Sequence, residues 1–166
     1  MQTDPIDDTV SKTFDVTIDL SDPCPTATLA TQPTFVDPWD FVVSDDAETR
    51  NLEDDYGNKI TLDPSFCPFT LSISTDDDSD KFDSNLSIND DGTDQTITIA
   101  KFVDNTLDVI GGKTQPSQNK EATIGISVNS PFNGDGVKTI DDQITFTINL
   151  QNPCYSTKTA SISDLP

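Results

Sequence analysis

The same strand-like sequence occurs twice in this chain, and equivalent positions of the two copies are 130 residues apart. Residues 15–24 read DVTIDLSDPC, and residues 145–154 read TFTINLQNPC. In both copies apolar and polar residues alternate up to a Pro-Cys pair, and a period of two is typical of a β-strand with one buried face. A repeat of domain size predicts a module that occurs in tandem, in which one unit ends where the next begins.

The two Pro-Cys pairs divide the chain into three parts. Residues 1–23 are predicted to be the terminal strand of a preceding repeat or a donor segment, residues 24–153 a complete unit, and residues 154–166 the start of the next repeat or a linker. The alternative is that two edge strands of one domain have similar sequences by convergence. The predicted inter-module strands are defined by their apolar positions, which are Phe14, Val16, Ile18 and Leu20 in the first copy and Ile144, Phe146, Ile148 and Leu150 in the second.

The other apolar runs of the chain also alternate and end in turn residues. An example is FTLSIST at 69–75, and two further runs, at 83–88 and 95–103, flank the acidic loop NDDGTD at 89–94. Asp-Gly tolerates positive φ, so this loop predicts a hairpin. The chain has 11 prolines and no sustained helical period. About eight or nine short strands at this spacing predict an all-β fold, a β-sandwich.

The chain resembles the tandem cadherin-like and immunoglobulin-like repeats of large ciliate-type extracellular proteins. The resemblance is carried by FDVTIDLSDPC at 14–24, FCPFTLSIS at 66–74 and ITFTINLQNPC at 144–154. In such repeats a strand ends in Asp-Pro-Cys or Asn-Pro-Cys, and a second cysteine precedes a later strand. The resemblance implies an immunoglobulin/cadherin-like β-sandwich repeat with extra terminal strands, located outside the cell or at the cell surface.

Three cysteines leave one without a partner inside a single unit. On the repeat pattern, Cys24 opens the complete unit and Cys67 lies within it, so we predict a disulfide between them. Cys154, the copy of Cys24, is then predicted to bond to a cysteine of a neighbouring module. The competing arrangement pairs Cys24 with Cys154 and leaves Cys67 free. No Cys-x-x-Cys spacing indicates a zinc site.

Charge restricts the partners that this chain can have. There are 9 Lys and Arg residues against 30 Asp and Glu residues, which gives a formal net charge of −21. A nucleic acid is therefore not an expected partner, because binding to phosphates requires a basic surface. Insertion into a membrane is not expected either, since no stretch approaches the ~18 apolar residues of a span. No secretion signal is apparent, so we expect that it has been removed or that the chain is part of a longer one.

Carboxylates in two turns form a candidate calcium site. Asp90, Asp91 and Asp94 lie in NDDGTD, and Asp135 lies in NGDG at 133–136. Calcium requires six to eight oxygen ligands from loops that curl around it, although Asp and Asn before Gly are also ordinary turn residues. Asn85 begins an Asn-Leu-Ser sequon, which predicts a glycosylation site in a secreted chain.

The chain has few of the residue types that catalysis usually requires, and we expect that it is not an enzyme. It contains no histidine, which excludes Ser-His-Asp and Cys-His mechanisms. We therefore expect a structural repeat module of an extracellular filament, surface coat or adhesin stalk, associated head to tail with neighbouring copies. The alternative is a calcium-dependent adhesion module or a glycan-binding module. For glycans, Trp39 and its aromatic neighbours could form a stacking platform, although a single Trp in a sandwich is more often part of the core.

Overall fold

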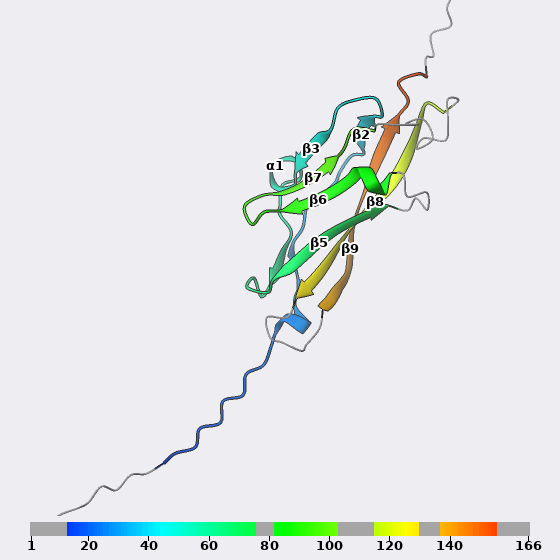
Figure 1. Ribbon diagram of the computed structural model, residues 1–166. Coiled ribbons are helices and arrows are strands. Elements are labelled where there is room, and N and C mark those ends of the chain that lie inside the picture. Colours follow the sequence, from blue (N-terminus) through cyan, green and yellow to red (C-terminus); the bar gives the residue numbers. More distant parts are fainter. Residues whose placement is uncertain (1–12, 76–81, 103–114, 130–136, 156–166) are drawn as a thin grey trace, which may run out of the picture.

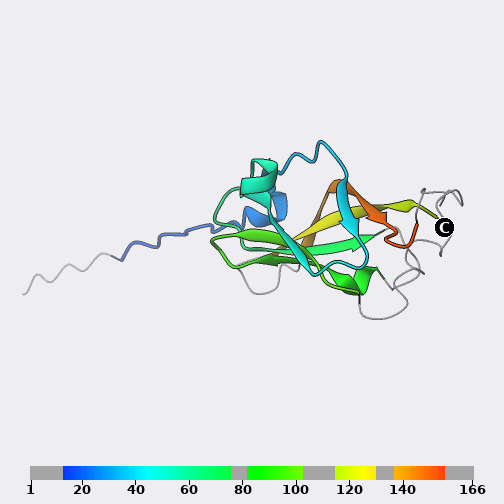
Figure 2. The same ribbon diagram turned by 90° about the horizontal axis from the view of Figure 1, so that it is seen from above.

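The computed structural model describes residues 13–75, 82–102, 115–129 and 137–155. These residues form an all-β sandwich, which confirms the predicted fold class. Figures 1 and 2 show two sheets that face each other across a single apolar core. None of the described helices is long and apolar enough to cross a membrane.

The larger sheet has four strands in the order β2-β9-β8-β5. Their bounds are Trp39–Val42 for β2, Phe69–Thr75 for β5, Ser117–Asn129 for β8 and Val137–Gln151 for β9. β8 pairs antiparallel with both β5 and β9. β2 runs parallel to the last part of β9, with Trp39 opposite Ile148. The second copy of the repeated strand is therefore an interior strand of this sheet.

The smaller sheet has three antiparallel strands in the order β3-β7-β6. Their bounds are Glu48–Asn51 for β3, Leu86–Asp90 for β6 and Gln95–Ile99 for β7. β6 and β7 form the predicted hairpin, and Gly92 in its loop has a φ of 85°. Because an L side chain rarely adopts that angle, glycine is favoured at this position.

Short elements complete the fold. β1 (Thr28–Thr31) and β4 (Thr61–Asp63) form a two-stranded antiparallel sheet. Two 3-10 turns, η1 (Cys24–Thr26) and η2 (Asp83–Asn85), precede β1 and β6. The peptide bond between Asp63 and Pro64 is cis.

The sequence analysis did not predict the short helix α1 (Leu52–Tyr56). The side chain of Asn51 caps this helix by accepting hydrogen bonds from the N–H groups of Glu53 and Asp54. Gly57 ends it with a φ of 83°. Asn before and Gly after a helix are recognised start and stop signals, so the sequence carries both signals for this helix.

The core is formed by strands whose residues alternate between buried and outward-facing positions. Inward-facing side chains of β2, β7, β8 and β9 are buried, while their neighbours along each strand face outward. Each large apolar side chain that becomes fully buried contributes roughly 1.5–3 kcal/mol. The largest fully buried residues are Trp39, Phe41, Leu52, Ile60, Phe82, Ile97, Ile99, Ile124, Ile126, Ile148 and Leu150.

Residues 14–20, the first predicted inter-module strand, join no sheet within the described part of this chain, so their pairing with another module stays a prediction. This segment is extended but pairs with no described strand. Figure 1 shows residues 13–23 leaving one end of the sandwich and running away from it, while β9 ends at the opposite end. The alternating pattern gives the segment the character of a strand, but a strand also needs a neighbour that binds its backbone groups.

Candidate functional site

The two copies of the repeated strand end in the same local turn. The N–H group of Cys24 donates a hydrogen bond to Oδ1 of Asp22 over 2.9 Å. The N–H group of Cys154 donates to Oδ1 of Asn152, also over 2.9 Å. Asp and Asn side chains both form such turns with the backbone two residues later. The equivalence of the two segments therefore extends from sequence to local geometry.

The environments of the two copies differ completely. The four inward-facing residues of the second copy, Ile144, Phe146, Ile148 and Leu150, are buried in the core. Their counterparts in the first copy are between 74% and 81% exposed, and these counterparts are Phe14, Val16, Ile18 and Leu20. The same apolar face is thus covered by the sandwich in one copy and faces water in the other.

A disulfide joins Cys24 to Cys67, as predicted, and their Cα atoms are 5.5 Å apart. Both cysteines are buried. The bond ties the exposed segment to the sandwich at a point two residues before β5 begins. Cys154 is a free and exposed thiol, so the alternative pairing of Cys24 with Cys154 is not adopted. Its predicted bond to a neighbouring module stays a prediction.

The carboxylates of the acidic hairpin loop mainly organise the loop itself. Asp91 accepts hydrogen bonds from the N–H groups of Asp94 and Thr93 at 2.7 Å and 2.8 Å. These bonds to the backbone hold the pKa of Asp91 below its ordinary value. Asp90 accepts from the N–H of Gly92 and from the side chain of Gln95.

The predicted calcium site is not assembled by these residues. Oδ1 of Asp94 accepts a hydrogen bond from Asn51 across the loop. Within the described part of the chain, no three acidic or sulfur-bearing side chains come close enough to hold a metal ion. Asp135 lies outside the described residues, so a site that includes it stays a prediction.

The side chain of Asn85 is engaged by the fold. Its Nδ2 group donates hydrogen bonds to the carbonyl oxygens of Ala100 and Lys101, at 3.3 Å and 3.1 Å. The residue is half-buried at the end of η2, just before β6. A glycan attached to this nitrogen would replace one of the two bonds, and glycosylation of Asn85 stays a prediction.

The two aromatic residues of β2 face the interior and do not form a binding platform. Trp39 and Phe41 are buried, and Nε1 of Trp39 has no hydrogen-bond partner in the described structure. The Arg50 guanidinium lies 4.5 Å from the centre of the Trp39 ring and donates to Tyr56 and Glu48. Partial burial opposes the charge of Arg50, but these hydrogen bonds outweigh it and raise the pKa of the guanidinium.

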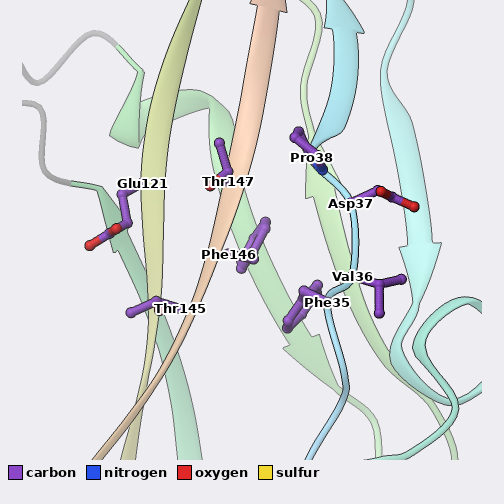
Figure 3. A pocket seen from close by; sticks show the side chains of 8 residues that line it. All are labelled: Phe35, Val36, Asp37, Pro38, Glu121, Thr145, Phe146 and Thr147. Atoms are coloured by element: carbon purple, nitrogen blue, oxygen red, sulfur yellow. The ribbon is translucent and has the colours of Figure 1, made fainter.

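A cavity of about 190 Å³ lies between β9 and the segment that leads into β2. Figure 3 shows the ring of Phe35 facing Phe146, and the two rings stack with their centres 4.5 Å apart. The two carboxylates at the cavity, Asp37 and Glu121, point away from each other in Figure 3. This arrangement does not resemble the facing pair of carboxylates that a glycosidase uses. A second cavity, of about 240 Å³, lies beside Lys59.

Sequence reasoning also missed a buried polar residue that fixes the hairpin. Oε1 of Gln95 accepts the N–H of Ile60 over 2.7 Å, and its Nε2 donates to the Ile60 carbonyl and to Asp90. Gln95 is 4% exposed. The only sign of this role in the sequence is a single glutamine at the start of an otherwise apolar strand, and it does not indicate which residue the side chain contacts.

No family model matches the chain, and neither does any curated protein or any solved structure. The resemblance to cadherin-like and immunoglobulin-like repeats therefore stays a prediction.

Proposed function

We propose that this chain is a structural module of an extracellular filament, surface coat or adhesin stalk, in which neighbouring units join head to tail. One observation carries the proposal: the apolar face of β9 is buried, whereas the same face of segment 14–20 is exposed. Covering an apolar side chain of this size stabilises by roughly 1.5–3 kcal/mol. A preceding unit that accepts the segment as its own β9-like strand supplies this cover.

The geometry of the chain ends supports a head-to-tail arrangement. The segment and β9 leave the sandwich at opposite ends (Figure 1). Each is followed by the same Asx turn and by a cysteine. In an array, a pull on the segment passes to Cys24 and through the disulfide to Cys67, next to β5. Cys154 makes the corresponding bond in the following unit.

Strand order supports the choice of an immunoglobulin-type repeat. The orders β3-β7-β6 and β9-β8-β5 correspond to strands B-E-D and G-F-C of an immunoglobulin-type sandwich. An extracellular location is supported by the Cys24–Cys67 bond, because disulfides persist in oxidising compartments.

A chain with two units in tandem tests the proposal. Residues 1–153 are joined directly to a second copy that begins at Cys24, so that β9 of the first unit leads into the second unit at the predicted period. We expect both units to fold, each with its own disulfide to Cys67. We also expect small-angle X-ray scattering to show an extended particle with a fixed angle between the units.

The matched control inserts three glycines between Pro153 and the second Cys24. The insertion leaves both sandwiches intact but separates the β9-like strand from the turn and the disulfide that fix its direction. We expect the control to show two units that move independently. If the direct fusion is equally flexible, or if its second unit does not form the disulfide, the head-to-tail proposal is wrong.

A further inference from the structure

β5 differs in charge from the other strands at the edges of the two facing sheets. Exposed edges are usually protected by charged side chains, which prevent pairing with another chain. The edge strands β2, β3 and β6 follow this rule, with Asp40, Glu48 and Asp90. β5 is also an edge strand, but residues 64–75 contain no charged residue. In composition β5 resembles the interior strand β7 rather than an edge.

The backbone of β5 has groups available for pairing. The Pro68 carbonyl accepts from Asn129 on the β8 side, whereas the N–H of Thr75 points away from β8 and donates to Asp83. Residues of an antiparallel strand alternate between its two sides. The N–H and C=O groups of Phe69, Leu71 and Ile73 therefore point away from β8, and no described residue is hydrogen-bonded to them on that side.

The side chains at this edge are also incompletely covered. The apolar residues of β5 are only half-buried, unlike those of β8 and β9. Phe66, just before the strand, is 66% exposed. The outward-facing side chains Thr70 and Ser72 are exposed and neutral.

We infer that β5 pairs antiparallel with β5 of a second copy, across a twofold axis at Leu71. In this register Leu71 lies opposite the partner's Leu71, and Phe69 lies opposite the partner's Ile73. Phe69, Leu71 and Ile73 are then all paired, and the two four-stranded sheets become one continuous sheet. Asp83 limits the paired stretch by occupying the N–H of Thr75.

A second copy is the occupant that this edge fits best, because the edge is complementary to itself. Each copy carries a net charge of −21, so most faces repel one another. Residues 64–75 carry no charge, so two copies can approach along β5 with less repulsion than along the charged edge strands. This lateral pairing is separate from the head-to-tail joint and does not depend on segment 14–20.

Sedimentation equilibrium of the full chain carrying Cys154→Ser, without reductant, tests the inference. The substitution prevents Cys154 from linking copies and keeps the Cys24–Cys67 disulfide intact. We expect a monomer–dimer equilibrium that shifts toward the dimer as salt concentration rises, since salt screens the repulsion between the two acidic bodies. A chain that stays monomeric at high concentration in high salt overturns the inference.

Two charge variants locate the contact. In the proposed register Thr70 lies opposite the partner's Ser72, so the double variants Thr70→Asp/Ser72→Asp and Thr70→Lys/Ser72→Lys each place like charges opposite one another. We expect each variant alone to dimerise at least about tenfold more weakly than the unmodified chain. Mixed in equal amounts, the two variants should form a heterodimer, because opposite charges then face each other.

The controls separate this pairing from other contacts and from misfolding. Thr28→Lys/Ala30→Lys alters β1, the other uncharged edge strand, and should leave dimerisation unchanged. Thermal unfolding of each variant reports whether it is folded, and formation of the heterodimer requires both partners to be folded. If the two charge variants dimerise normally, or if Ile18→Asp removes the dimer, the contact lies elsewhere and the inference is wrong.

Discussion

Ile18 and Ile148 occupy the same position in two copies of one strand, yet Ile148 is fully buried and Ile18 is 74% exposed. Ile148 lies opposite Trp39 on one side and Lys120 on the other, inside the four-stranded sheet. Ile18 lies beside no strand that the structure describes. The sequence of the strand therefore does not decide whether it is buried. Ile148 is buried in β9, which has a strand paired on each side.

The two isoleucines should respond differently to the same substitution. Ile148→Asp places a carboxylate in the core and should unfold the domain or cost about 4 kcal/mol or more. Ile18→Asp should change the free energy of unfolding of the isolated domain by less than about 0.5 kcal/mol. Urea denaturation measures both. A large loss of stability in Ile18→Asp would show that the segment packs on its own sandwich.

Loss of the disulfide should destabilise the domain strongly. The bond closes a loop between residues 43 positions apart, and unfolded-chain entropy assigns such a loop about 4 kcal/mol. We expect Cys24→Ala/Cys67→Ala to lower the free energy of unfolding by roughly this amount. Cys154→Ser is the matched control and should have no effect on the isolated domain, since Cys154 is free and exposed.

Asp91 should contribute a stabilisation that depends on pH. Its pKa is lowered in the folded chain by hydrogen bonds from Asp94 and Thr93. The contribution is therefore complete above the ordinary carboxyl pKa of 3.8 and is lost as the pH falls through the lowered value. Asp91→Asn should be less stable than the unmodified chain at pH 7, and the difference should shrink below about pH 4.

The control for this measurement is Asp37→Asn, which removes a carboxylate without a described hydrogen bond. Both variants reduce the negative charge equally, so a difference between them reports the loop bonds of Asp91. An Asp91→Asn profile parallel to that of the unmodified chain from pH 2 to pH 7 would contradict the assignment.

Gln95 should be difficult to replace. Gln95→Met keeps the size of the side chain but leaves the buried N–H and C=O groups of Ile60 without partners. An unsatisfied buried polar group costs about 1–3 kcal/mol, and we expect a loss in that range by chemical denaturation. Gln118→Met, on the half-buried start of β8, is a control that should cost little.

Added salt should stabilise the domain. The net charge of −21 makes the folded chain repel itself. The screening length falls from about 30 Å at 0.01 M salt to about 3 Å at 1 M. We expect the melting temperature to rise over this range of NaCl, and a fall would contradict this account. Calcium and magnesium at equal ionic strength should act alike, whereas a saturable effect of calcium alone would indicate a specific calcium site.

Sequence reasoning worked where the signal was local and repeated. Period-two alternation predicted the strands at 69–75 and 144–150, and Asp-Gly predicted the β6–β7 hairpin. It failed for β3, whose residues Glu48 and Arg50 carry no alternating apolar pattern. β3 is held by pairing with β7 and by the contact of Arg50 with Trp39, and a contact between residues this far apart leaves no local signal.

By itself, the sequence determined the all-β fold, the 130-residue offset between the two similar segments, and the pairing of Cys24 with Cys67 as one of two alternatives. These depend on alternation and spacing, which are properties of the chain. Only the tertiary structure decided between the two disulfides, and only it separated the buried β9 from the exposed segment 14–20. The physical reason is that burial depends on the surroundings: the alternating sequence is buried in β9, between β2 and β8, and exposed in segment 14–20, which no described strand adjoins.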